Sequence, residues 1–118
     1  MNSSRDGRID YVELAANDLP ATRLFFETVF NWTFQDWGPD YISFKDGAMN
    51  GGFYSSDGFS RIESGGALVV LYHSNLEDIS EKVVLEGGTI EKEIFSFPGG
   101  RRFHFLEPSG NEFAIWSE

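Results

Sequence analysis

The alternation of apolar and polar residues predicts that the folded part of the chain begins with a β-strand and continues into an amphipathic helix. Residues 9–14 alternate in the manner of a half-buried strand. Asn17 and Asp18 then form an N-cap signal, Pro20 suits the first helical turn, and apolar residues recur at helical spacing as far as residue 30. Asn31 stands where a left-handed residue is favoured after a helix, so we expect the helix to end there.

Three short β-like segments follow, at residues 33–37, 41–45 and 49–54. Glycine, proline and aspartate residues separate them, as is typical of turns. The next stretch, residues 55–66, is rich in serine and glycine and is interpreted as a linker. The first half of the chain is therefore predicted to form a βαβββ module over residues 8–54.

The pattern then starts again in the second half of the chain. Residues 67–72 form an apolar strand segment, Asn75 provides the next helix cap, and Gly87 with Gly88 ends that helix. Further strands are expected at residues 89–95, 101–106 and 113–116. Residues 67–118 are therefore predicted to form a second βαβββ module.

The two halves match at an offset of 57 residues through the strand and the helix. The matched pairs are Val12 with Val69, Leu14 with Leu71, Leu19 with Leu76, and Asn31 with Gly88. The alternative is a chance agreement of helix and strand patterns, since few residues are identical between the halves. Repetition of one supersecondary unit predicts an α+β fold in which two pseudo-symmetric βαβββ modules make up a single domain, residues 1–118.

Length and charge restrict what this domain can do. The 118 residues include 19 acidic and 9 basic ones, which gives a formal net charge of −10. A chain of this length supports one hydrophobic core, and 41% of its residues are hydrophobic. An acidic chain whose longest basic run is Arg101 and Arg102 repels phosphate backbones, so we expect no nucleic-acid partner.

The sequence contains no cysteine and no long apolar segment. The absence of cysteine removes disulfides and thiolate chemistry, and it leaves His73 and His104 as the nitrogen ligands for a metal ion. No stretch approaches the ~20 apolar residues that cross a bilayer, and the first residues lack the apolar segment of a secretory signal. We therefore expect a cytoplasmic protein without a membrane partner.

Two segments and their order give the chain a resemblance to a known superfamily. Residues 9–32, IDYVELAANDLPATRLFFETVFNW, are similar to the opening strand and Asp-Leu helix start of the vicinal oxygen chelate superfamily. Residues 105–117, FLEPSGNEFAIWS, are similar to its Pro-x-Gly-Asn ending. The superfamily includes glyoxalase I, the bleomycin-resistance proteins and extradiol dioxygenases. The resemblance implies a curved mixed sheet with helices on its convex side and a ligand groove on its concave side, commonly completed in a homodimer.

In the metal enzymes of this superfamily, the ligands usually come from the first and last strands of each module. The resemblance transfers these positions to Tyr11, to Phe53 or Tyr54, to Leu68 and to Ala114. Leucine and alanine cannot coordinate a metal ion, and a neutral tyrosine is a poor ligand for divalent cations. We therefore expect no metal and no cofactor, as in the bleomycin-resistance branch.

Strand alternation assigns side chains to the groove without reference to the superfamily. Val12 and Leu14 are expected to meet the helix, so their neighbours along the strand face the other way. The same argument for the other strands predicts a groove with aromatic walls and a few polar groups, which suits a small-molecule ligand. The predicted ligand-binding residues are Tyr11, Tyr41, Ser43, Tyr54, Leu68, Val70, Arg102, Ala114 and Trp116.

Glu13 and His104 are the candidate catalytic pair on this face. If they converge, the carboxylate orients the imidazole and provides a general base without a metal. In the alternative interpretation, Glu13 is a solvated strand residue and His104 an ordinary cross-strand partner. Arg102 is interpreted either as an anion-binding residue or as half of an exposed pair with Arg101.

The sequence thus predicts a metal-free, dimeric small-molecule-binding protein that acts by sequestration or through an unassigned activity. The alternative is a metal-dependent lyase or dioxygenase with His104, Glu13 and Glu112 as non-standard ligands. A third interpretation is a partner-binding domain whose own side chains fill the groove. Four aromatic residues exceed what one module needs on its surface, and we expect them at a dimer seam or at the groove mouth. These residues are Trp32, Phe34, Trp37 and Phe59.

Overall fold

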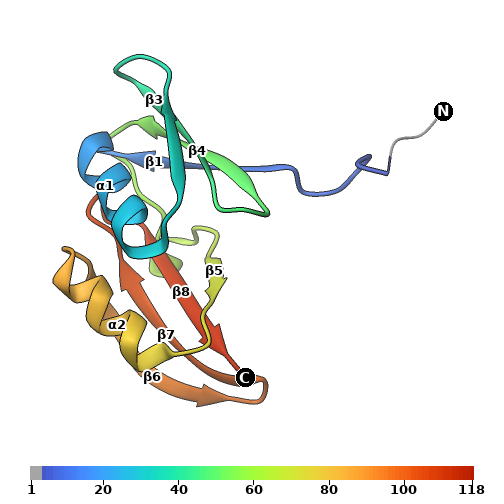
Figure 1. Ribbon diagram of the computed structural model, residues 1–118, viewed down its shortest axis with the longest axis vertical. Coiled ribbons are helices and arrows are strands. Elements are labelled where there is room, and N and C mark those ends of the chain that lie inside the picture. The colour runs from blue at the N-terminus through green and yellow to red at the C-terminus, as the bar shows by residue number, and fades with distance from the viewer. Residues whose placement is uncertain (1–3) are drawn as a thin grey trace.

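The computed structural model describes residues 4–118, and the first half of the chain forms one βαβββ module (Figure 1). Its elements are β1 Tyr11–Ala16, α1 Leu19–Phe30, β2 Thr33–Asp36, β3 Tyr41–Lys45 and β4 Asn50–Ser55. The hydrogen-bonded order of the strands is β1-β4-β3-β2. Strands β1 and β4 are parallel, and the other neighbours are antiparallel.

The second half repeats this arrangement. Its elements are the 3-10 helix η1 Ile62–Ser64, β5 Val69–Tyr72, α2 Leu76–Leu85, β6 Thr89–Phe97, β7 Gly100–Leu106 and β8 Glu112–Ser117. The strand order β5-β8-β7-β6 is that of the first module, element for element. The predicted α+β class with two βαβββ modules is confirmed. The strands form two mixed four-stranded sheets, one in each module, in place of one continuous sheet.

The strand register shows that the repeat in the sequence is also a structural repeat. Leu14 in β1 lies opposite Phe53 in β4, and Leu71 in β5 lies opposite Ile115 in β8. Leu14, Phe53 and Ile115 belong to the hydrophobic core, and Leu71 packs against it. Alternation along the strands therefore identified the core-facing side of each sheet.

Both helices begin and end where the capping signals predict. The Asp18 side chain accepts a hydrogen bond from the first turn of α1, and Asn75 does the same for α2. Asn31 adopts the left-handed conformation with φ 59° and donates its N–H to the carbonyl of Glu27. In Figure 1 the two helices lie along the same side of the molecule.

The first strand starts later than predicted. The structure places β1 at Tyr11–Ala16, whereas alternation indicated residues 9–14. Ile9 is 78% exposed and precedes the strand. Ala15 and Ala16 are buried and pair with β4 instead. The limits of β1 are thus set by its pairing with β4. The residue pattern of a single strand carries no information about this pairing.

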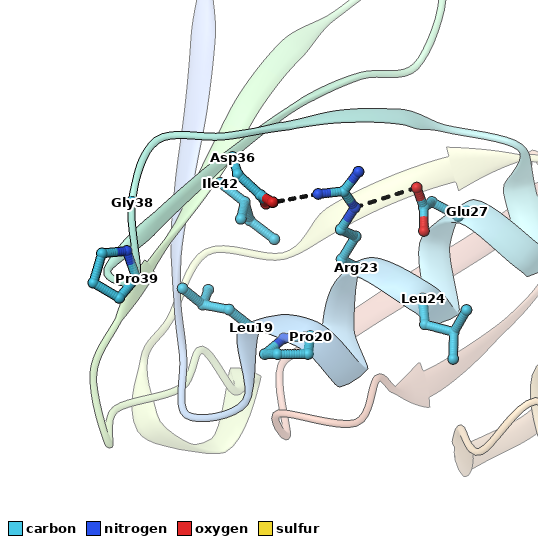
Figure 2. Close-up of a pocket in the computed structure, with 9 residues that line it drawn as sticks. All are labelled: Leu19, Pro20, Arg23, Leu24, Glu27, Asp36, Gly38, Pro39 and Ile42. Carbon is cyan, nitrogen blue, oxygen red and sulfur yellow. Dashed lines mark hydrogen bonds and ion pairs between the residues drawn. The ribbon is translucent and has the colours of Figure 1, made fainter.

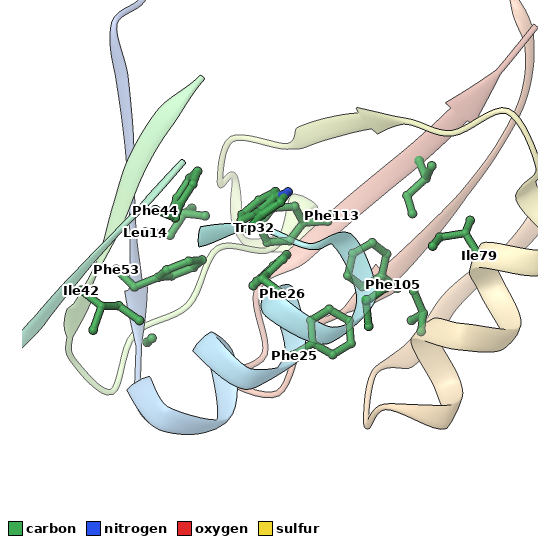
Figure 3. Close-up of a cluster of buried hydrophobic side chains, with 14 of the residues drawn as sticks. Leu14, Phe25, Phe26, Trp32, Ile42, Phe44, Phe53, Ile79, Phe105 and Phe113 are labelled. Carbon is green, nitrogen blue, oxygen red and sulfur yellow. The ribbon is translucent and has the colours of Figure 1, made fainter. Parts of the chain in front are cut away.

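Helix α1 carries the side chains that join the two sheets. Its Phe26 lies 5.6 Å from Phe53 of β4 and 5.1 Å from Phe113 of β8, measured between ring centroids (Figure 3). The adjacent Phe25 lies 5.8 Å from Phe105 of β7. One hydrophobic core therefore extends across both modules.

The structure corrects the expectation for two of the four extra aromatic residues. Trp32 is only 7% exposed and stacks on two core phenylalanine rings at 4.4 and 4.5 Å. The left-handed turn at Asn31 brings the chain back onto the core at this point. Phe34 is half-buried against the same cluster, whereas Trp37 and Phe59 are exposed.

The turn between β7 and β8, residues 107–111, holds a buried carboxylate that reaches the first module. Glu107 accepts hydrogen bonds from the Thr22 hydroxyl of α1 at 2.6 Å and from the Ser109 N–H at 3.1 Å. The Asn111 side chain donates a further hydrogen bond at 2.9 Å. Burial raises the pKa of the Glu107 carboxyl, although these hydrogen bonds act in the opposite direction.

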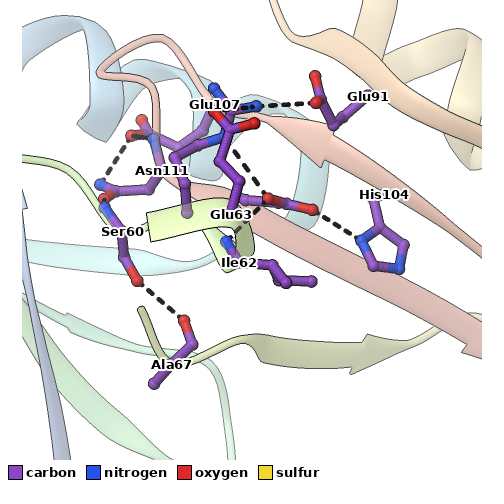
Figure 4. A network of polar contacts seen from close by, with 10 residues as sticks. Ser60, Ile62, Glu63, Ala67, Glu91, His104, Glu107 and Asn111 are labelled. Carbon is purple, nitrogen blue, oxygen red and sulfur yellow. Dashed lines mark hydrogen bonds and ion pairs between the residues drawn. The ribbon is translucent and has the colours of Figure 1, made fainter. Parts of the chain in front are cut away.

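Asn111 ties three parts of the chain together and is fully buried. Besides its bond to Glu107, its side chain donates to the carbonyl of Ala15 in β1 at 2.7 Å. Its side-chain Oδ1 atom accepts the N–H of Ser60 at 2.7 Å (Figure 4). The Pro-x-Gly-Asn segment therefore fastens the end of the second module to β1 and to the segment that joins the modules.

We expect Asn111→Ala to lower the free energy of unfolding by about 2–5 kcal/mol, because it leaves the buried polar groups of Ala15 and Ser60 without partners. Urea denaturation followed by circular dichroism measures this change. The matched control is Asn17→Ala at an exposed asparagine, with an expected change below about 0.5 kcal/mol. Equal stability of the two variants would show that this network does not hold the modules together.

Candidate functional site

The face of the first sheet that points away from α1 carries five of the predicted residues. They are Tyr11 and Glu13 on β1, Tyr41 and Ser43 on β3, and Tyr54 on β4. Tyr11, Tyr41 and Ser43 line a hollow of about 510 Å³. Tyr54 lies opposite Tyr41 in the register and is exposed, but it does not line this hollow.

Other residues of this hollow were not assigned to it from the sequence. Trp37, expected at a seam or a groove mouth, lines the hollow and donates its indole N–H to the Ser43 hydroxyl at 2.9 Å. The remaining lining residues are Gln35, Phe44, Lys45 and Asn50. Gln35 and Ser43 are directly opposite each other in β2 and β3, so strand pairing brings them together.

The two tyrosines of the hollow form a directed chain of hydrogen bonds. Tyr41 donates its hydroxyl to Glu13 at 2.9 Å, so the 2.5 Å contact between the two phenols has Tyr11 as its donor. Burial, with the hydrogen bonds to Tyr11 and Glu13, raises the pKa of the Tyr41 phenol far above its ordinary value. Gly52 lies beneath the rings, and a Cβ there would come within 2.0 Å of the Tyr41 hydroxyl.

The structure does not join the expected catalytic pair. Glu13 is bound by Tyr41, and His104 is bound by Glu112 and Arg102 instead. Glu13 belongs to the first sheet and His104 to the second, so strand alternation alone gave no information on their separation. Glu112 is the carboxylate that pairs with the imidazole, and it was named from the sequence only as a possible metal ligand.

His104 is 2% exposed and both of its ring nitrogens are engaged. The Nδ1 atom lies 2.8 Å from the Glu112 carboxylate. The Nε2 atom lies 3.2 Å from Nε and 2.9 Å from Nη2 of Arg102. Since a guanidinium can only donate, Nε2 is the acceptor and Nδ1 carries the hydrogen. This arrangement selects one neutral tautomer of His104.

Glu112 is held from its other side by the segment that joins the modules. Its Oε1 atom accepts the N–H of Ile62 at 3.2 Å and lies 3.5 Å from Nε of Arg61 (Figure 4). Desolvation opposes ionisation of this buried carboxyl, but the hydrogen bonds from His104 and Ile62 and the neighbouring Arg61 lower its pKa. Arg102, His104, Glu112 and Arg61 therefore form a chain that alternates cation, imidazole, carboxylate and cation.

The groove-side face of the second sheet is covered at one end and open at the other. Ala114 is fully buried beside His104, and Leu68 is half-buried just before β5. At the open end, Val70, Arg102 and Trp116 line a hollow of about 360 Å³ together with Phe97 and Gly99. Phe97 was not assigned to the groove because the strand was predicted to end at residue 95, whereas β6 continues to Phe97.

A third hollow, of about 390 Å³, lies between α1 and the turn that joins β2 to β3 (Figure 2). Its basic residue, Arg23, is bound by two acidic residues of the same lining, Asp36 at 2.6 Å and Glu27 at 3.3 Å. These carboxylates already neutralise the guanidinium. We therefore do not place a ligand in this hollow.

Residues 8–115 match the Glyoxalase/Bleomycin resistance protein/Dioxygenase superfamily. Because the match spans almost the whole chain, the chain belongs to this superfamily. The resemblance seen in residues 9–32 and 105–117 is thereby confirmed. No match is found among curated proteins.

Solved structures share this fold at low sequence identity. A glyoxalase-related enzyme from Fulvimarina pelagi has a TM-score of 0.77 at 15% identity, covering 95% of this chain and 88% of that chain. Lactoylglutathione lyase from Agrobacterium tumefaciens has a TM-score of 0.72 at 18% identity, with coverages of 94% and 93%. A mutant of the fosfomycin resistance protein FosX from Listeria monocytogenes, complexed with Mn(II) and 1S,2S-dihydroxypropylphosphonic acid, has a TM-score of 0.77 at 16% identity, with coverages of 94% and 90%.

The residues at the superfamily's metal-ligand positions do not fit a metal ion. Leu68 and Ala114 have no donor atom, and the Tyr11 hydroxyl donates its hydrogen to Tyr41. Across residues 4–118, no group of three or more His, Cys, Asp or Glu side chains is placed to hold a metal. His104 and Glu112 do not replace the missing ligands, since the imidazole nitrogen that Glu112 leaves free faces the Arg102 cation.

His73, the second histidine, has a structural contact. Its Nδ1 atom accepts the N–H of Asn75 at 2.9 Å, at the start of α2.

Within the described part of the chain, neither helix is long and apolar enough to cross a membrane.

The opposite pKa shifts of Glu112 and Glu107 predict opposite responses to acid. A lowered pKa contributes stability above the unfolded-state value, about 4.5, that is lost as the pH falls through the folded-state pKa. The difference in free energy of unfolding between wild type and Glu112→Gln should therefore narrow as the pH falls below about 4.5. A raised pKa contributes stability at low pH, so the gap for Glu107→Gln should widen on acidification.

Urea denaturation between pH 7 and pH 3.5 measures both gaps. At pH 7 we expect Glu112→Gln to cost about 1–3 kcal/mol, because His104 and Arg61 lose a charged partner. A gap for Glu112→Gln that widens below pH 4.5 would contradict the assigned direction.

Proposed function

We propose that this chain binds a small molecule on the groove-side faces of its two sheets without a metal ion, and that it sequesters this ligand or acts on it through a metal-free reaction. The hollow of the first sheet carries the proposal. Tyr11, Tyr41 and Trp37 supply aromatic walls there, beside the Ser43 hydroxyl and the Lys45 side chain. Aromatic walls with a few polar groups are typical of small-molecule sites.

The comparisons support this class of ligand. The FosX relative was solved with a small phosphonic acid, and two other relatives are described as a glyoxalase-related enzyme and a lactoylglutathione lyase. The lack of donor atoms at Leu68 and Ala114 supports binding without a metal. The metal-dependent alternative rests on His104, Glu112 and Glu13, of which Glu13 is bound to Tyr41 instead.

We further propose that the protein is a homodimer. Ile9, Trp37 and Phe59 are large apolar side chains that are each more than half exposed. Residues 4–10 are exposed and extend away from the two sheets (Figure 1). Exposed aromatic residues are enriched at protein interfaces, which supports a second copy of this chain as the partner.

Native mass spectrometry of protein purified without chelator tests these points together. We expect a species of twice the 13.3 kDa chain mass that carries an organic adduct and no metal. Trp37→Ala should reduce the retained adduct about tenfold, because the loss of an aromatic wall costs ~1–1.5 kcal/mol of binding.

Leu85→Ala is the control, since Leu85 is an exposed apolar residue of α2 that lies outside both groove-side hollows and is not among the proposed interface residues. Stoichiometric metal that is lost in His104→Ala would establish the metal-dependent alternative instead. A species of a single chain mass at micromolar concentration would contradict the dimer.

A further inference from the structure

Arg102 is a half-buried cation without a carboxylate partner. The other half-buried arginines have such partners: Arg23 contacts Glu27 and Asp36, and Arg61 contacts Glu63, Glu91 and Glu112. In the part of the chain that the structure describes, no carboxylate lies within 4.0 Å of the Arg102 guanidinium. Removing a cation from water without a counter-charge costs free energy. The presence of such a cation in an acidic protein therefore indicates a function for Arg102.

The neighbours of Arg102 fix its orientation without neutralising it. Its guanidinium carbon lies 5.9 Å from the ring centroid of Phe95 and 5.8 Å from that of Phe97. Its Nε and one N–H of Nη2 point to the neutral His104. The edge formed by Nη1 and the second N–H of Nη2 is thus left for another acceptor, and this edge matches the two oxygens of a carboxylate.

His104 and Glu112 act as positioning residues for this guanidinium. The hydrogen bond from Nδ1 to Glu112 places the hydrogen of the neutral ring on Nδ1, which leaves the lone pair of Nε2 to accept from Arg102. A protonated Nε2 would instead point a hydrogen at the cation. The buried pair therefore holds Arg102 in one orientation at the wall of the hollow.

The rest of the hollow is apolar. Val70, Phe97, Gly99 and Trp116 surround Arg102 in the space of about 360 Å³. Trp116 lies 6.5 Å from Phe97 between ring centroids, with the rings at 68° to each other. Two aromatic walls beside a single cation suit a ligand with one planar apolar part and one negative charge.

We propose that Arg102 binds the carboxylate of a small aromatic monocarboxylate whose ring lies against Phe97 and Trp116. This inference rests on the proposed function and names the ligand class of the second hollow. It runs against the preference for neutral or cationic ligands that the net charge of −10 favours at long range. The surface charge is screened over about 8 Å at physiological ionic strength, whereas the contact with Arg102 is direct. A phosphate dianion is less suited, since one guanidinium faces it in acidic surroundings.

Isothermal titration calorimetry with phenylacetate and its neutral isostere phenylacetamide tests the proposal. We expect wild type to bind phenylacetate at least about tenfold more tightly than phenylacetamide, because a bidentate contact to an ion is worth ~1.5–3 kcal/mol. Arg102→Met should remove that preference, so that the variant binds the two probes equally. Arg102→Lys keeps the charge without the planar fork and should retain only part of the preference.

Arg101→Met is the matched control, because Arg101 is the adjacent arginine, pairs with Glu77 and does not line the hollow. It should bind both probes as wild type does. Circular dichroism of each variant confirms that it is folded, and Arg102→Lys serves if Arg102→Met does not fold.

The outcomes separate the two proposals. Equal binding of the two probes by wild type overturns the carboxylate assignment and leaves small-molecule binding in place. Tighter binding of phenyl phosphate than of phenylacetate overturns the choice of carboxylate over phosphate. If none of the three probes binds, the carboxylate proposal fails, while an organic adduct in the native mass spectrum still upholds the proposed function.

Discussion

The structure depends on one helix being shared between two sheets. Each module offers an apolar sheet face and a single helix, and a four-stranded sheet with one helix of this size buries little on its own. Phe26 of α1 solves this by lying between Phe53 of the first module and Phe113 of the second, and the adjacent Phe25 packs against Phe105 of the second module. The repeat in the sequence is therefore not a pair of independent units. The two halves are folded together around the aromatic side chains of the first helix.

Two buried carboxylates have different structural roles. Glu107 lies among neutral donors from α1 and the turn between β7 and β8, and it holds the modules in place. Glu112 lies between His104 and Arg61, and it sets the imidazole that faces Arg102. Burial raises the pKa of both carboxyls; at Glu107 it outweighs the hydrogen bonds from neutral donors, whereas at Glu112 the hydrogen bonds from His104 and Ile62 and the neighbouring Arg61 outweigh it.

The groove-side faces of the two sheets differ more than the repeat suggests. The first sheet carries a hydrogen-bonded tyrosine pair over Gly52, an arrangement that a larger residue at that position would exclude. The second sheet is closed around His104 and Ala114 and open beside Arg102. The positions that carry metal ligands elsewhere in the superfamily hold Tyr11, Leu68 and Ala114 in this chain. The ligand binding that we propose for this groove therefore depends on aromatic surface, on Arg102 and on hydrogen bonding.

Local sequence determined the helix limits, the order of helix and strands along each module and the core-facing side of each strand, because capping and alternation act over only a few residues. It also indicated six of the residues that line the two groove-side hollows, including Arg102 and Trp116. The partners of these residues were decided by tertiary structure alone. Trp32 entered the core, β1 was placed by its pairing with β4, and His104 took Glu112 in place of Glu13, since these contacts join segments far apart in the chain or depend on strand register. Alternation predicts the face of the sheet on which a side chain lies. Which residues the side chain contacts on that face is decided by packing in three dimensions.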